Sequence, residues 1–251
     1  MPAQPLVEQL RDLITALTAH GMVRDALGVV FSIAMPLLVF AAALGLRRIG
    51  VSLRAARMLV RLAGGAWIFI AFYWIYYWPA GWLPPMALLI ANLYLRGKKW
   101  TRPLREKDED PPPLFFGHQG SLLVLMLLFW WPGYQFMVIG GVAAATLGRE
   151  TAAIVNRRWG KRRFRFKGGR EHTFEEATAM AGVTLTAIFL TNLFYARIPD
   201  VWFIPWCLFG ALLAAAVATV TDIYARQEVA GALMPVLTSL TLYFYTMAGF
   251  R

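Results

Sequence analysis

The sequence predicts an all-α integral membrane protein that crosses the bilayer several times. Apolar segments of roughly 15–22 residues recur along the chain, and charged side chains are confined to the stretches between them. Only 16% of the residues are charged, against about a quarter in an average soluble domain. A bilayer core needs about 20 apolar helical residues, so most of these segments are long enough to cross it.

Eight apolar segments are candidate spans. They cover residues 26–46, 58–78, 83–96, 114–131, 134–149, 174–195, 201–221 and 229–249. The third and fifth are short for a full crossing. We therefore expect about eight transmembrane helices in one membrane domain, residues 26–249. Cytoplasmic loops are expected near residues 47–57, 97–113, 149–173 and 222–228.

Residues 1–25 precede the first span and differ from it in pattern. Leu10, Leu13 and Leu17 recur at helical spacing among residues of both charge signs. The segment lacks the small-residue cleavage site of a secretory signal. We expect an N-terminal amphipathic segment.

The basic residues predict an orientation. All but four of the 25 Lys and Arg residues fall in one alternate set of loops, the exceptions being Arg11, Arg24, Arg197 and Arg251. Cytoplasmic loops carry the excess of Lys and Arg, so both termini are expected outside and residues 149–173 in the cytoplasm, in a bacterial inner membrane. This bias accounts for much of the net charge of +11 without a nucleic-acid partner, and it favours anionic lipid head groups.

Two further observations exclude classes of function. The single cysteine, Cys207, excludes intrachain disulfides and cysteine-rich metal sites. Charged residues are almost absent from the middle of the spans, which disfavours a transporter.

The loop between the fifth and sixth spans is the candidate site. Residues 149–177 hold 13 of the chain's 39 charged residues. Glu150, at the end of the fifth span, is a suitable Mg²⁺ ligand for a nucleotide, or alternatively the ion-pair partner of a nearby arginine. Gly160-Lys161 and Gly168-Gly169-Arg170 place exposed backbone beside cations, as phosphate sites do, although ordinary glycine turns have the same pattern.

A capping box lies at the end of this loop. Thr173 and Glu176 stand three residues apart before an apolar run, which predicts a helix that starts near Phe174. The box favours a capping role for Glu176 over a catalytic one. The free N–H groups of such a helix start attract anions, and His172 lies directly ahead of it.

The stretch "GRETAAIVNRRWGKRRFRFKGGREHTFEEATAMAG" resembles the signature of the CTP-dependent lipid-alcohol kinases, which comprise dolichol, phytol and yeast-type diacylglycerol kinases. These enzymes are distantly similar to phosphatidate cytidylyltransferases. Glu150 stands at the family's Asp position, Gly160-Lys161 in its central stretch, and Thr173-Phe174-Glu175 in its last part. Fainter matches lie at 57–65 and 222–235.

The resemblance implies a function and a set of site residues. CTP with Mg²⁺ would phosphorylate a membrane lipid alcohol, such as phytol, a polyprenol or diacylglycerol, at the cytoplasmic face. Glu150 and Asp222 would hold the metal. The catalytic residues would be Glu150, Lys161, Arg170, His172 and Glu175. His118 is another candidate base, although its position at the start of the fourth span favours an exposed, solvated role. Nucleotide contacts would come from Gly160, Lys161, Arg162, Gly168, Gly169, Arg170 and Thr173.

Departures from the family pattern leave two alternatives open. Arg149-Glu150 replaces Gly-Asp, and Ala230-Gly231 replaces Asp-Asn. One alternative is a cytidylyltransferase that acts on a phospholipid or isoprenyl phosphate. The other is a non-catalytic membrane subunit descended from the family. The oligomeric state is left open.

Overall fold

The protein is a bundle of long apolar helices. The computed structural model describes residues 21–76, 78–96, 98–104, 115–116, 119–130, 134–165, 171–195, 203–225 and 227–249. Within these residues, six helices are long and apolar enough to cross a membrane. They are α2 (Gly21–Arg48), α3 (Leu53–Trp74), the continuous helix Gln135–Trp159, α8 (Phe174–Tyr195), α9 (Phe203–Tyr224) and α10 (Gln227–Gly249). The all-α polytopic prediction is confirmed.

The described residues also form two shorter helices. Helices α4 (Leu83–Arg96) and α5 (Gln119–Phe129) have 14 and 11 residues. At 1.5 Å per residue they extend only about 21 and 17 Å, less than a bilayer core of about 30 Å. Short 3₁₀ segments, η1 (Trp78–Trp82) and η2 (Lys99–Leu104), lie on either side of α4. The third and fourth expected spans are thus the short ones.

The fifth expected span is longer than predicted. Helix α6 (Gln135–Ala143), the π-helical turn η3 (Ala144–Gly148) and α7 (Arg149–Trp159) run on as one helix of 25 residues. Residues 149–173 were expected as a loop, but Arg, Glu and Ala are good helix formers, so the helix continues past the apolar segment. The rest of the expected loop, after Trp159, contains two short antiparallel strands, β1 (Arg163–Arg165) and β2 (Glu171–Thr173).

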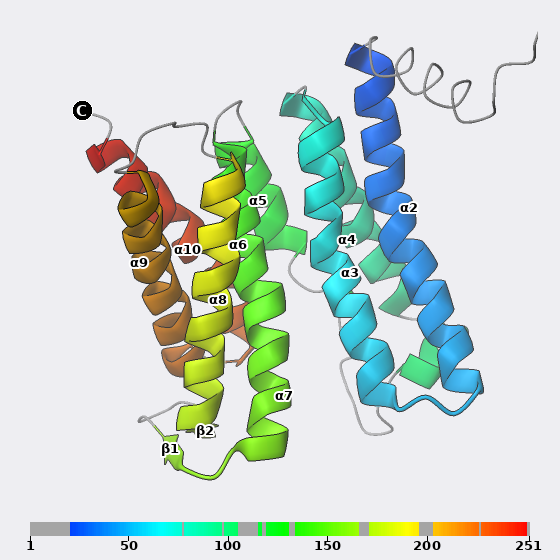
Figure 1. The fold of residues 1–251 in the computed structure, drawn as a ribbon. Helices are drawn as coiled ribbons and strands as arrows, with labels where there is room; N and C mark the ends of the chain where they lie inside the picture. Colours follow the sequence, from blue (N-terminus) through cyan, green and yellow to red (C-terminus); the bar gives the residue numbers. More distant parts are fainter. Residues whose placement is uncertain are drawn as a thin grey trace, which may run out of the picture.

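Helix α6 lies at the centre of the bundle. It contacts α3, α5, α8 and α10, and eight of its nine residues are buried. Helices α2, α3 and α4 lie on one side of it, and α8, α9 and α10 on the other (Figure 1). Glycines in α6 allow α10 to approach it closely. A Cβ at Gly140 would lie 2.8 Å from Leu242 Cδ1, and one at Gly141 would overlap the Pro235 carbonyl.

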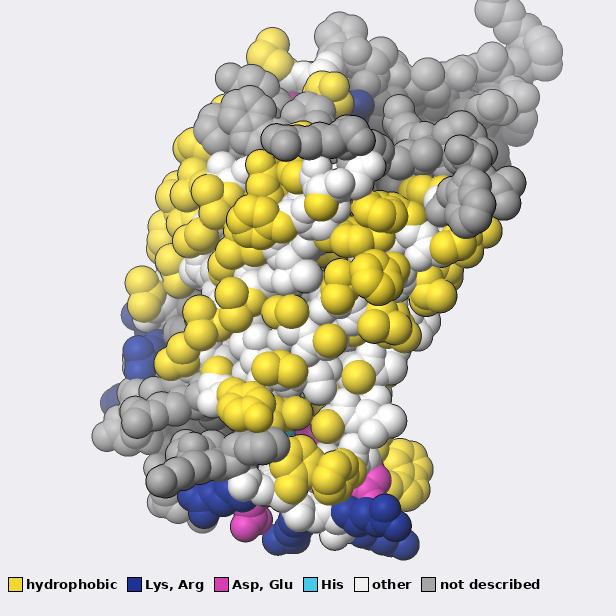
Figure 2. All heavy atoms as spheres, turned by 90° about the vertical axis from the view of Figure 1, so that its left-hand side faces the viewer, with side chains coloured by type: hydrophobic (Ala, Val, Ile, Leu, Met, Phe, Trp, Pro, Cys, Tyr) yellow, Lys and Arg dark blue, Asp and Glu magenta, His cyan; other side chains and the backbone are white. Residues whose placement is uncertain are grey.

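Charge gathers at one end of this bundle. Hydrophobic side chains cover the middle of the face drawn in Figure 2, and Lys and Arg gather at its lower end. We call this the basic end; α2 and α7 end there, α3 begins there, and β1 and β2 lie there (Figure 1). The first residue of α2 and the last of α10 lie at the opposite end. An apolar surface bounded by charge is that of an integral membrane protein.

Gly141→Ala is expected to destabilise the bundle by about 1–3 kcal/mol, because the added methyl group meets the Pro235 backbone and the Ser239 hydroxyl. Gly182→Ala is the matched control: nothing lies within 4 Å of a Cβ there, and alanine favours the helix. Thermal unfolding in detergent micelles measures both. Equal melting temperatures for the two variants would contradict this packing.

Candidate functional site

The strand β2 and the first turn of α8 place two titratable side chains at the basic end. Phe164 of β1 pairs with His172 of β2, and the two rings stack with centroids 6.2 Å apart. The Phe174 N–H donates to the Arg162 carbonyl at 3.1 Å, which joins the strands to the helix. His172 is therefore turned inward and is 3% exposed.

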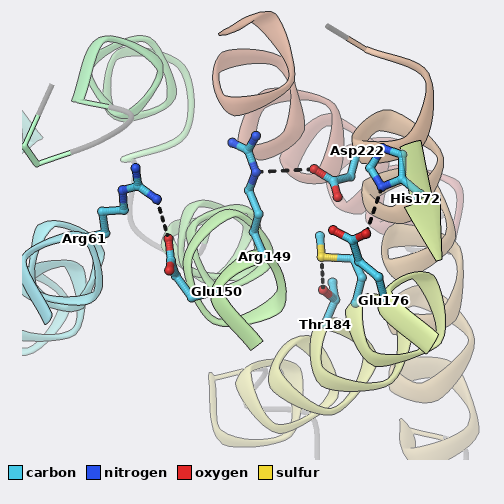
Figure 3. Close-up of polar contacts among 8 residues, drawn as sticks. Arg61, Arg149, Glu150, His172, Glu176, Thr184 and Asp222 are labelled. Carbon is cyan, nitrogen blue, oxygen red and sulfur yellow. Dashed lines mark hydrogen bonds and ion pairs between the residues drawn. The ribbon is translucent and has the colours of Figure 1, made fainter. Parts of the chain in front are cut away.

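His172, Glu176 and Asp222 form a cluster that we call the His–Glu–Asp group. His172 Nδ1 lies 3.4 Å from Glu176 Oε2, and both side chains are buried. Asp222, on the last turn of α9, completes the group and is 9% exposed. One ligand atom from each residue lies within 4.8 Å of the other two (Figure 3).

Arg149, the first residue of α7, brings a positive charge to this group. Its Nε lies 3.4 Å from Asp222 Oδ1, and its side chain is 21% exposed. Two carboxylates are thus buried beside one guanidinium and one imidazole. Burying charge is costly unless it is paired, so these four side chains depend on one another.

Glu150 lies apart from the His–Glu–Asp group. Arg61 of α3 donates from Nη1 to Glu150 Oε1 at 3.3 Å. Arg149 and Glu150 leave α7 in different directions (Figure 3). The predicted metal pair, Glu150 and Asp222, is therefore not brought together: each carboxylate faces an arginine.

The π-helical turn η3 sets this arrangement. A π turn adds one residue to a helix, so the residues after it are rotated by about 100° relative to a plain α-helix. It stands directly before Arg149, and the Thr146 hydroxyl within it donates to the Val142 carbonyl at 2.7 Å. Gly148 at its end packs against Thr184 and Met180 of α8. Turns of this kind are frequent at functional sites.

Thr173 and Gly160, both predicted as nucleotide contacts, hold the local fold together. The Glu176 N–H donates to Thr173 Oγ1 at 3.2 Å, which confirms the predicted cap, and α8 begins at Phe174 as expected. The Thr173 hydroxyl donates in turn to Asn156 Oδ1 at 3.1 Å, and the Gly160 N–H to the Asn156 carbonyl at 3.0 Å. Asn156 thus links the end of α7 to the start of α8.

Lys161, Arg162 and Glu175 form the outer part of the site. The side chains of Lys161 and Arg162 are exposed, and their backbone N–H groups each donate to Glu175 Oε2 at 3.4 Å. Glu175, predicted as catalytic, therefore holds the backbone of the basic segment. Gly168, Gly169, Arg170 and His118 lie outside the described residues.

The sequence did not indicate that the Glu176 side chain is buried against His172, or that Arg149 pairs with Asp222. Thr173 caps α8 by accepting the Glu176 N–H, whereas the Glu176 side chain, which was expected to serve as part of the cap, faces His172. His172 lies in β2, two residues before α8 begins, so helical spacing could not have indicated its contact with Glu176. Arg149 meets Asp222 from a distant part of the chain, which no local pattern indicates.

Comparisons with protein-family models, with curated proteins and with solved structures find no match for this chain.

Glu150→Gln and Arg61→Gln are each expected to lower the free energy of unfolding by no more than roughly 1 kcal/mol, because half of the Arg61 side chain is exposed and water screens the pair. The double variant should cost little more than either single one, since both remove the same interaction. A double-mutant cycle in detergent measures this. Strictly additive losses would show that the two side chains do not interact.

Proposed function

We propose that the chain is a membrane-embedded phosphotransferase that moves the γ-phosphate of CTP to a lipid alcohol at the basic end. One observation carries the proposal: the His–Glu–Asp group lies buried at the end of an apolar bundle, with the partly buried Arg149 against it and an exposed basic segment beside it. Ionisable groups in such a position are costly and mark functional sites by default. The family resemblance of the same stretch supports the choice of reaction.

The basic side chains have a clear part in this reaction. Lys161 and Arg162 are exposed cations that neutralise a triphosphate, and Glu175 holds their backbone in place. Arg149 reaches inward from the same end and stabilises charge on the transferring phosphoryl group, which is most of what such catalysis requires. Mg²⁺ enters as part of the Mg²⁺·CTP substrate, because Glu150 and Asp222 do not form a joint site for it.

The transfer is a single displacement. The lipid hydroxyl oxygen forms a bond to the γ-phosphorus, and the bond from that phosphorus to the β–γ bridging oxygen breaks. CDP leaves with the bonding electron pair, and the hydroxyl proton passes to water at the membrane face. The products are CDP and a phosphorylated lipid.

The lipid acceptor fits the apolar surface of the bundle. Large hydrophobic side chains such as Leu38, Phe194 and Phe244 are exposed along the helices, so the tail of an isoprenoid alcohol or diacylglycerol lies against them as other lipids do. Its hydroxyl then reaches the basic end. The same basic residues attract anionic head groups by about 1 kcal/mol each.

A non-catalytic subunit is the second candidate function. Three carboxylates at the basic end face a basic side chain: Glu150 faces Arg61, Asp222 faces Arg149, and Glu176 faces His172. Such internal pairing balances charge without any ligand. A cytidylyltransferase is the other enzyme alternative, since it would use the same phosphate contacts.

Purified protein in lipid nanodiscs is expected to transfer label from γ-labelled CTP to phytol, a polyprenol or diacylglycerol. Arg149→Gln should lower kcat/KM by about 10²–10³, because it removes a donor that stabilises transition-state charge. Arg54→Gln removes the same charge from an exposed position at the basic end and should change kcat/KM by less than about twofold. Absence of turnover with every alcohol, or equal losses in both variants, would contradict the proposal.

The position of the label separates the alternatives. Label from α-labelled CTP in the lipid, with release of pyrophosphate, identifies a cytidylyltransferase. Stable co-purification in a larger assembly, without turnover, identifies a non-catalytic subunit.

A further inference from the structure

We infer that His172, Glu176 and Asp222 bind a divalent first-row transition-metal ion, of the Zn²⁺ or Mn²⁺ type. The inference does not depend on the proposed phosphotransfer. Three separate elements, β2, α8 and α9, deliver the three donors to one point. Imidazole and carboxylate, both of which bind such ions in proteins, are present together.

The geometry of the group suits an ion. Donor atoms about 2.1 Å from a tetrahedral metal lie roughly 3.4 Å from one another. His172 Nδ1 and Glu176 Oε2 already lie 3.4 Å apart, and the ligand atoms of all three residues lie within 4.8 Å. Small side-chain rotations of Asp222 would complete a three-ligand site.

The donor set selects the class of metal. Mg²⁺ and Ca²⁺ prefer oxygen ligands alone, whereas an imidazole with two carboxylates suits Zn²⁺, Mn²⁺ and Fe²⁺. This set therefore differs from the all-carboxylate Mg²⁺ pair that the sequence predicted.

The surroundings hold His172 and Glu176 in position for binding. The Phe164 ring stacks on His172, and the Thr173 cap fixes the first turn of α8, from which Glu176 projects. Both residues are 3% exposed, so an ion bound there would be largely shielded from solvent. Rigid, buried ligands raise affinity because they lose little freedom on binding.

A charge count indicates what the bound state would attract. A neutral His172, two carboxylates and a divalent ion sum to zero. Arg149, 3.4 Å from Asp222, adds one positive charge. Three protein ligands leave a fourth position open on a tetrahedral ion. An anion, such as a phosphate oxygen, is the ligand that this charge balance favours at that position.

The test measures metal binding to the protein alone, without nucleotide or lipid. Tag-free, full-length protein in detergent is stripped with a chelator, titrated with Zn²⁺ or Mn²⁺, and analysed by elemental mass spectrometry and Mn²⁺ electron paramagnetic resonance. We expect one ion per chain, a rise in melting temperature, and no displacement by equimolar Mg²⁺. Failure of this binding leaves the transfer assay unaffected, so the two proposals fail separately.

His172→Gln and Asp222→Asn should each weaken metal binding by at least about tenfold. Each variant loses a metal ligand, and even the loss of a group that only orients a ligand has an effect of this size. Glu171→Gln is the matched control, because this neighbour of His172 is exposed and pairs with Arg163 at 3.5 Å. Glu150→Gln changes the carboxylate that faces Arg61, outside the His–Glu–Asp group, and should also bind metal like the unchanged chain. Variants are compared only where they elute as the unchanged chain does in gel filtration. Less than one ion per chain, or equal binding by Asp222→Asn and the unchanged protein, would overturn the inference.

Discussion

The close packing of the helix Gln135–Trp159 is the constraint on which the rest of the structure depends. Its glycines leave no room for a side chain: Gly141 lies against the backbone of α10, and Gly148 against Met180 and Thr184 of α8. Helices gain little from burying apolar surface in lipid, so contacts at this short range contribute much of the free energy of association. The same packing brings η3 against α3, α8 and α9, and the polar end α7 against α8.

That packing also determines which charges meet. The π turn η3 lies between the glycine-rich part and Arg149, and α7 therefore presents Arg149 to α9 and Glu150 to α3. Arg149 can face Asp222 only because the helices are close and the π turn gives α7 its rotation. The His–Glu–Asp group, in turn, is enclosed between the start of α8 and the end of α9. A change in helix packing is thus expected to disturb the site even where it touches no charged residue.

The sequence was sufficient to predict the class of fold, because long apolar segments with charge between them have one solution in a bilayer. It also located the start of α8 at Phe174, since a capping box is a local signal. The extent of α7 was missed because charge marks the end of a span but does not stop a helix. The pairs Arg61–Glu150 and Arg149–Asp222 join residues far apart in the chain, so only tertiary packing reveals them.

The central claim is that the charge buried at the basic end serves a phosphate-bearing ligand and is more than a structural ion-pair network. Calorimetric titration of Mg²⁺·CTP into the purified protein tests it most directly, with Arg149→Gln as the comparison. We expect one nucleotide to bind per chain and the variant to lose at least about tenfold in affinity, the effect of removing a charged hydrogen-bond donor. No binding, or equal affinity in both proteins, would contradict it.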